Sequence, residues 1–222
     1  MRVCVVIPTY NEEKEIAGVL EGIKEQGLQA VVVDDGSTDK TAGIAEEKGA
    51  VVLRNKANLG KGASLVRGFE YALKDGFEAV ITMDGDGQHD PVDIPEFMRG
   101  AQGSPYGVFI GNRMAKPHSM PWLRIATNKF MSWFISCLAG QAIPDTQCGF
   151  RLIKKEALQK LELKTRNYEI ESEMIIKAAR QGFKVESINI TTVYRNEKSR
   201  INPFVDTLRF ISYISRELWT WR

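Results

Sequence analysis

Residues 79–88 read AVITMDGDGQ, an apolar run followed at once by two aspartates, two glycines and a glutamine. The run from Ala79 to Met83 has the length and composition of a buried strand. Because glycine lets the backbone turn sharply, the side-chain oxygens of Asp84, Asp86 and Gln88 are expected to gather just beyond that strand. Such oxygens suit Mg²⁺ or Mn²⁺ carrying a diphosphate, but aspartate and glycine also form ordinary turns. The stretch therefore predicts either a metal site or an acidic turn.

Similar junctions between strand and turn occur earlier in the chain. Buried strands are predicted at residues 3–7, 31–33 and 51–53, with amphipathic helices between them. The first helix is expected to begin after a cap at Asn11 and to stop at Gly27. Strands that alternate with helices predict an α/β fold with a doubly wound, mostly parallel sheet, in which ligands bind beyond the carboxyl ends of the strands.

The second half of the sequence has a different pattern. Helices are predicted at residues 120–138 and 169–179, on either side of a loop at 141–151. Residues 183–190 suggest a strand pair or one bulged strand, and apolar residues from 208 to 218 mark a last amphipathic helix. Because no linker rich in glycine, proline or serine interrupts the chain, residues 1–222 are expected to form one domain. A boundary near residue 115 would be a functional division within it.

Composition limits the classes of function that fit. The chain has 222 residues, of which 43% are hydrophobic and 26% charged, as in ordinary globular domains. The net charge of +2 is too small to argue for a nucleic-acid partner by bulk electrostatics, and no such partner is expected. Three cysteines without a CxxC motif argue against a disulfide framework or a zinc site and favour a reducing, cytoplasmic compartment. We expect neither a secretory signal nor a spanning helix, because the sequence contains no apolar stretch of sufficient length.

Two common nucleotide motifs do not match. Gly60-Lys61-Gly62 lacks the spacing and the Ser or Thr of a Walker A loop. Gly85-Asp86-Gly87 is not followed by the third glycine of a dinucleotide-binding fingerprint. The sequence therefore argues against a P-loop nucleotidase and against a dinucleotide-dependent enzyme.

Four motifs taken together resemble those of the family 2 glycosyltransferases, which have the GT-A fold. They are IPTYNE at residues 7–12, VDDGSTD at 33–39, NLGKG at 58–62 and DGDGQ at 84–88, in the order and spacing of that family. Two further motifs, GNR at 111–113 and DTQCGFR at 145–151, are most similar to the dolichol-phosphate mannose synthase branch. That branch transfers a sugar from a nucleotide to a polyprenyl phosphate.

The resemblance implies roles for individual residues. The metal, Mg²⁺ or Mn²⁺, would be held by Asp86 and Gln88, and the base would be contacted by Asp34 or Asp35. Asp84, Asp86, Arg113 and Asp145 are the implied catalytic residues. The nucleotide site as a whole is expected to comprise Pro8, Tyr10, Glu12, Val33, Asp34, Asp35, Lys61, Asp84 and Gly85. In this reading residues 1–115 bind the nucleotide sugar and residues 116–222 bind the acceptor.

Phosphates of donor or acceptor are expected to meet a set of cations. The set is Arg113, Arg151, Arg195, Lys198 and Arg200. In the last three the chain departs from the branch, because the segment 194–200 lacks a glycine and has Arg where Lys is usual. Their alternative interpretation is a solvated turn of charges.

The implied reaction is inverting transfer of a hexose, mannose or glucose, from a GDP or UDP sugar. A phosphate acceptor is already ionised at neutral pH and needs little help from a base. A hydroxyl acceptor would need a carboxylate near its proton, and Asp145 is the candidate. Two alternatives therefore stay open: a family member with a soluble hydroxyl acceptor, and a non-catalytic subunit that only binds nucleotide sugars.

Residues 120–135 combine aromatic and aliphatic side chains with Arg124 and Lys129. This composition suits a helix at a membrane interface, although such helices are more often part of the core. The tryptophans at 219 and 221 beside Arg222 suggest a second anchor. We therefore expect a protein bound peripherally to the cytoplasmic face of a membrane, with a membrane-anchored partner protein as one option.

Overall fold

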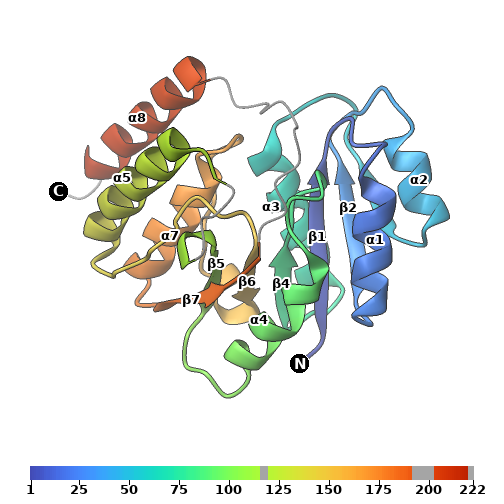
Figure 1. The fold of residues 1–222 in the computed structure, drawn as a ribbon, viewed down its shortest axis with the longest axis horizontal. Helices are drawn as coiled ribbons and strands as arrows, with labels where there is room; N and C mark the ends of the chain where they lie inside the picture. The colour runs from blue at the N-terminus through green and yellow to red at the C-terminus, as the bar shows by residue number, and fades with distance from the viewer. Residues whose placement is uncertain (116–119, 192–202, 220–222) are drawn as a thin grey trace.

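A single mixed sheet runs through the computed structural model, which describes residues 1–115, 120–191 and 203–219 (Figure 1). Seven strands make up the sheet in these residues. In order across the sheet they are β3 (Val51–Arg54), β2 (Gln29–Asp34), β1 (Val3–Thr9), β4 (Ala79–Thr82), β6 (Arg151–Lys154), β5 (Val108–Asn112) and β7 (Val185–Asn189).

The N-terminal strands confirm the doubly wound arrangement. β1 pairs in parallel with both β2 and β4, and β2 pairs in parallel with β3. Helices α1 (Ile16–Glu25), α2 (Thr41–Glu47) and α3 (Lys61–Lys74) connect these strands. The strand order reverses after β3, so right-handed crossovers put α3 on the opposite face from α1 and α2. The carboxyl ends of β1, β2 and β4 consequently meet at one edge, beside the start of α3 (Figure 1).

The centre of the sheet contains a strand that the sequence did not predict. β6 lies between β4 and β5 and is antiparallel to both. It comprises only Arg-Leu-Ile-Lys, too short for a periodic pattern, and β5 was seen only as the motif around Gly111. Residues 183–190 contain one strand, β7, which pairs in parallel with β5, so the option of a strand pair is wrong.

The helices of the second half gather on the face that carries α3. They are α5 (Trp122–Ala139), α7 (Ile170–Arg180) and α8 (Pro203–Trp219), and α8 is the outermost (Figure 1). Rings of Phe134 on α5 and Phe210 on α8 have centroids 6.2 Å apart. The shorter elements are η1 (Pro91–Asp93), α4 (Ile94–Ala101), η2 (Arg113–Ala115) and α6 (Lys155–Leu158). Among the described residues, no helix is long and apolar enough to cross a membrane.

The expected helix cap at Asn11 is wrong. α1 begins five residues later, after Glu15, and its first turn has no side-chain cap. Asn11 instead has a left-handed backbone (φ 53°), its side chain accepts a hydrogen bond from the Thr38 N–H at 2.8 Å, and its own N–H donates to Ser37 Oγ. Residues 10–15 are thereby kept as a loop at the edge of the sheet, where they form part of a pocket.

Candidate active site

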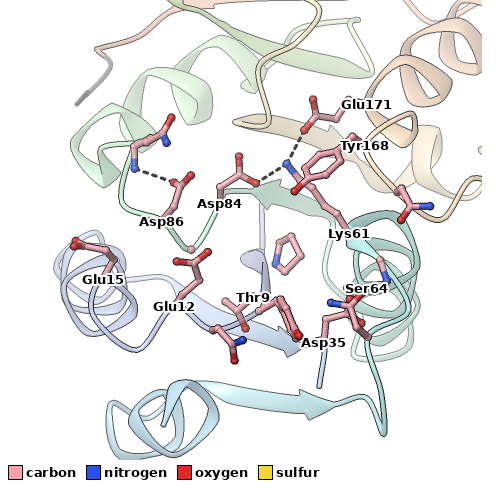
Figure 2. A pocket seen from close by; sticks show the side chains of 18 of the residues that line it. Thr9, Glu12, Glu15, Asp35, Lys61, Ser64, Asp84, Asp86, Tyr168 and Glu171 are labelled. Atoms are coloured by element: carbon pink, nitrogen blue, oxygen red, sulfur yellow. Dashed lines mark hydrogen bonds and ion pairs between the residues drawn. The ribbon is translucent and has the colours of Figure 1, made fainter. Parts of the chain in front are cut away.

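A pocket of about 980 Å³ opens at the carboxyl edge of the parallel strands. Residues of both halves line it, from the loop after β1 to the first turn of α7. Figure 2 shows Glu12, Asp84, Asp86 and Lys61 around this space. Of the residues expected from the sequence, the pocket brings together Pro8, Tyr10, Glu12, Asp35, Lys61, Asp84, Gly85, Asp86, Gln88 and Arg113.

Lys61 lies between two carboxylates inside the pocket. Its Nζ is 2.6 Å from Asp84 Oδ1 and 2.7 Å from Glu171 Oε1 (Figure 2). Burial alone would lower the pKa of Lys61, but the charges of Asp84 and Glu171 outweigh burial and raise it. Burial likewise opposes ionisation of Asp84, and the Lys61 charge overcomes it and lowers the pKa of this carboxyl. The pocket therefore holds a fixed positive charge beside a fixed negative one.

The sequence analysis missed the part of the pocket that the second half contributes around α7. Asn167, Tyr168 and Glu171 come from the end of the loop before α7 and from its first turn. Glu171 is 8% exposed, and Tyr168 has its ring 5.8 Å from Lys61 Nζ. Acidic residues are common in the first turn of any helix, so the sequence offered no sign that this one faces a site.

The DGDGQ turn is held in place by its own residues. Asp86 Oδ1 accepts a hydrogen bond from the Gln88 N–H at 3.0 Å. His89 Nδ1 accepts one from the Asp84 N–H at 3.2 Å, and burial lowers the pKa of this histidine to about 4, so the ring is neutral. A Cβ on Gly85 would lie 2.8 Å from Thr9 Cγ2, so the turn packs too closely on β1 for a larger residue.

The turn fits a cation that keeps most of its ligands outside the protein. The described residues contain no group of three or more His, Cys, Asp or Glu arranged to enclose a metal. Asp86 and Gln88 both line the pocket and supply one carboxylate and one amide oxygen. Mg²⁺ is usually bound by one or two protein carboxylates together with water and substrate phosphates, which matches this sparse donor set.

The two aspartates after β2 have separate positions. Asp35 lines the pocket, and its carboxylate accepts hydrogen bonds from the N–H groups of Leu59 and Gly60 at 2.9 and 2.8 Å. Asp34 is buried outside the pocket and accepts a hydrogen bond from the Ser37 N–H. Val33 is fully buried in the sheet. The structure thus does not bring Asp34 or Val33 to the pocket surface.

Arg113 reaches the pocket while Asp145 lies behind it. Arg113 Nε donates to Asp145 Oδ2 at 2.7 Å, and Arg113 Nη2 donates to Asp145 Oδ1 at 2.9 Å. The Asp145 side chain is fully buried and also accepts from the Arg113 and Gln147 N–H groups. Asp145 is therefore placed to orient Arg113, and its carboxylate does not line the pocket.

Arg151 has a structural role inside the protein. Its side chain is fully buried, and its guanidinium donates to the carbonyl oxygens of Cys148, Thr146 and Glu171 at 2.8, 3.0 and 2.6 Å. It joins the 145–151 loop to α7 and does not line the pocket. This corrects the expectation that Arg151 meets a phosphate. Arg195, Lys198 and Arg200 lie outside the described residues.

α5 contributes both to the pocket and to an exposed apolar surface. Arg124, in the first turn of this helix, lines the pocket. The same helix exposes Trp122 (78%) and Trp133 (62%), and α8 packs beside it. We define the α5–α8 apolar face by its exposed residues Trp122, Leu123, Phe130, Trp133, Leu208 and Ile211.

Comparisons with known proteins point to one enzyme family. A family model described as Glycosyl transferase family 2 matches residues 4–162. A dolichyl-phosphate hexose transferase of Haloferax volcanii is 31% identical over 90% of this chain and 86% of its own length. A polyprenol monophosphomannose synthase of Mycolicibacterium smegmatis is 28% identical over 87% of this chain and 78% of its own.

A solved structure shows the same fold. Glucosyl-3-phosphoglycerate synthase from Mycobacterium tuberculosis, in complex with Mn²⁺, uridine diphosphate and glucosyl-3-phosphoglycerate, superposes with a TM-score of 0.71. The match covers 93% of this chain and 74% of that one, at 19% sequence identity. The likeness establishes the GT-A architecture and does not identify the substrate.

Proposed function

Because the chain belongs to glycosyl transferase family 2, we propose that it transfers a hexose from a nucleoside diphosphate sugar to a polyprenyl phosphate. That it is a glycosyltransferase with a GT-A fold follows from the family and from the sheet. One observation carries the choice of acceptor: the helix that supplies Arg124 to the pocket also exposes Trp122 and Trp133 on the α5–α8 apolar face. A lipid phosphate has a matching charged head and apolar tail.

The donor occupies the half of the pocket built by the N-terminal strands. Pro8, Tyr10 and Glu12 border the nucleotide, and Asp35, which faces the pocket, is the aspartate assigned to the base. Asp84 faces the ribose or the sugar, with Lys61 beside it. Mannose and glucose carried on GDP or UDP are the donors proposed, and the solved relative with uridine diphosphate supports this class of ligand.

Asp86 and Gln88 are proposed to hold Mg²⁺ or Mn²⁺ together with the donor diphosphate. Support comes from the donor chemistry of these two residues and from the Mn²⁺ in the structurally similar glucosyl-3-phosphoglycerate synthase. When bound, the cation supplies positive charge that neutralises the leaving diphosphate. The residues of the chain position the turn for this: Gln88 donates its N–H to Asp86, and His89 accepts the Asp84 N–H.

The acceptor phosphate is assigned to the arginines of the pocket. Arg113 is held in one orientation by Asp145, and Arg124 enters from α5. A planar guanidinium fixed by a bidentate carboxylate presents its remaining N–H groups in a defined direction, which suits a phosphate. These two cations compensate the charge of the acceptor and hold one of its oxygens toward the donor sugar.

The proposed step is a direct displacement with inversion. A bond forms between an acceptor phosphate oxygen and the anomeric carbon, and the bond between that carbon and the donor diphosphate oxygen breaks. The electron pair leaves with the nucleoside diphosphate, and no proton has to move because the attacking oxygen is already ionised. A hydroxyl acceptor would need a base, and the sealed Asp145 does not favour it.

The α5–α8 apolar face is proposed to lie on the cytoplasmic surface of a membrane. Its tryptophans and aliphatic side chains are exposed, and the exposed Lys129 of α5 supplies a cation for anionic headgroups, while Arg124 of the same helix faces the pocket. The polyprenyl tail then stays in the lipid while its phosphate reaches the pocket. Residues 1–115 would build most of the donor site, to which the second half adds Asn167 and Tyr168. Residues 116–222 would also serve the acceptor and the membrane.

The nature of the nucleophile provides the test. The purified protein is incubated with each donor and Mg²⁺ or Mn²⁺, and with either a polyprenyl phosphate or the matching polyprenol in the same detergent. Transfer to the phosphate without transfer to the alcohol is the expected result. Transfer to the alcohol at a similar rate would show that the acceptor is activated by a base, and the direct displacement would be wrong.

A further inference from the structure

Glu173 is a buried carboxylate that does not touch the pocket and yet has every acceptor position occupied. It lies in the first turn of α7 and is 1% exposed. Oε1 accepts from the Lys164 N–H at 2.9 Å, and Oε2 accepts from the N–H and the hydroxyl of Thr165 at 2.8 and 2.6 Å. Lys177, one helical turn onward, makes an ion pair with it at 2.6 Å. Such a site costs desolvation energy and calls for a reason.

The segment that Glu173 holds, residues 163–168, is named here the α7 lead-in loop. Its backbone crosses the start of α3: the Ala63 N–H donates to the Arg166 carbonyl at 3.1 Å. A Cβ on Gly62 would lie 2.6 Å from the Thr165 carbonyl oxygen, and one on Gly60 would collide with the Arg166 carbonyl oxygen. Because Gly60 and Gly62 of the NLGKG motif have no side chains, the backbone of the α7 lead-in loop can pack directly against them.

The same loop delivers two residues to the pocket. Asn167 and Tyr168 line it, immediately after the two residues whose carbonyls lie on the glycines. The Ile170 and Glu171 N–H groups donate to the carbonyls of Asn167 and Tyr168, so the loop leads without a break into α7. One end of the lead-in is thus fixed by Glu173, and its other end forms part of the pocket wall beside Lys61.

We propose that Glu173 is a positioning residue for donor binding: by holding the α7 lead-in loop against the start of α3, it places Asn167 and Tyr168 in the donor pocket. The proposal rests on the assignment of this pocket to a nucleoside diphosphate sugar. Glu173 contacts neither donor nor acceptor and acts through the backbone of Lys164 and Thr165.

The hydrogen bonds of Glu173 support its role as a positioning residue. Burial alone would raise the pKa of Glu173, but hydrogen bonds from Lys177 and Thr165 outweigh it and lower the pKa, so the group stays ionised. A glutamine in its place keeps the size but has one NH₂ group, which cannot accept from the loop N–H groups. Glu169 directly precedes α7, its side chain accepts no such hydrogen bond from the described loop residues, and it lies outside the pocket lining, so Glu169→Gln is a matched control.

The test compares Glu173→Gln, Thr165→Val and Glu169→Gln with the wild type. Calorimetry measures the affinity for UDP and GDP with Mn²⁺, and hydrogen exchange follows the amides of Lys164 and Thr165. Glu173→Gln is expected to weaken diphosphate binding about ten-fold and to speed exchange at both amides, because a charged hydrogen-bonded anchor is lost. Thr165→Val should show a smaller loss in the same direction, and Glu169→Gln none.

Each of the other outcomes contradicts one part of the proposal. Faster exchange in Glu173→Gln with unchanged diphosphate affinity would make the residue purely structural and overturn the inference. If Glu173→Gln does not fold, unchanged affinity in folded Thr165→Val would overturn it as well. A wild type that binds neither UDP nor GDP would overturn the donor assignment on which the inference rests, and the exchange data would still show whether Glu173 holds the loop.

Discussion

The carboxylate of Asp145 accepts two hydrogen bonds from the guanidinium of Arg113, from Nε at 2.7 Å and from Nη2 at 2.9 Å, and of the two residues only Arg113 lines the pocket. The pair sits at the junction between η2 and the 145–151 loop, which are distant in sequence. Its geometry decides between two acceptor chemistries, because an aspartate occupied in this way orients a cation and does not take a proton. The account of an ionised phosphate acceptor depends on that distinction.

Removing the charge of Asp145 should therefore act through Arg113. Asp145→Asn and Arg113→Gln are each expected to lower kcat/KM for the acceptor about ten-fold or more, and the double variant should be little worse than the weaker single variant. The shape of the pH–rate profile should not change, because no catalytic base is lost. Additive losses, or an altered basic limb of the profile in Asp145→Asn, would return Asp145 to the role of a base.

Lys61 is expected to be needed for donor binding. In Lys61→Met, Asp84 and Glu171 lose their shared ammonium and face each other as like charges. The KM for the nucleotide sugar should rise about ten-fold or more, with a smaller effect on the acceptor KM. Lys74→Met, at the exposed end of the same helix, is the control and should leave both constants unchanged. An unchanged donor KM in Lys61→Met would argue against this role.

Asp86 should be indispensable for turnover. Asp86→Ala is expected to reduce kcat at least about 100-fold with the fold intact by circular dichroism, because a charge-neutralising group at the diphosphate is lost. EDTA should abolish wild-type activity, and Mg²⁺ or Mn²⁺ should restore it. Glu96→Ala, which removes a half-buried carboxylate of α4 that pairs with Arg99 and lies outside the pocket lining, should behave as wild type. Full activity in Asp86→Ala would remove the metal assignment.

The α5–α8 apolar face should bind lipid. Wild-type protein is expected to float with anionic liposomes, and the double variant Trp122→Ser, Trp133→Ser should remain in the dense fraction, because two exposed indoles are lost. Val92→Ser, which removes an apolar side chain of 60% exposure from η1, is the matched control. Flotation by the tryptophan variant at the wild-type level would show that another surface makes the contact.

The buried thiol of Cys148 should make the stability of the protein depend on pH. Burial raises the pKa of Cys148 to about 12, so between pH 9 and 12 the folded thiol stays protonated while an unfolded thiol ionises. The unfolded state then binds fewer protons, and stability falls as pH rises above 9. Between pH 8 and 10 the wild type should lose about 1 kcal/mol more than Cys148→Ala, measured by urea unfolding. Equal losses would show that Cys148 is not protected by burial.

The sequence predicted those features that depend on residues close together in the chain. β1, β2 and β4 are apolar runs ending in turn residues, and that pattern predicts a ligand site at their carboxyl ends, where the pocket lies. The DGDGQ turn was predicted for the same reason, since its two glycines and its oxygen donors are adjacent in the chain. Asn11 shows the limit of local reasoning, because its partner Thr38 lies 27 residues away.

Features that depend on distant segments could not be predicted. Lys61 and Glu171 form an ion pair across 110 residues of sequence, and no periodic pattern links them. Arg151 belongs to a motif that suggests phosphate binding, yet three backbone carbonyls enclose its guanidinium. β6 was missed because four residues with charged ends do not show the alternation of a strand, although they complete the centre of the sheet.

The most direct measurement of the central claim follows the labelled sugar itself. The protein is incubated with GDP-mannose or UDP-glucose labelled in the hexose, Mg²⁺ or Mn²⁺, and liposomes that contain polyprenyl phosphate. The account predicts label in the organic phase, bound to the lipid through a phosphodiester and dependent on Asp86. Label that stays out of the organic phase with every donor, while a water-soluble glycoside forms, would contradict it.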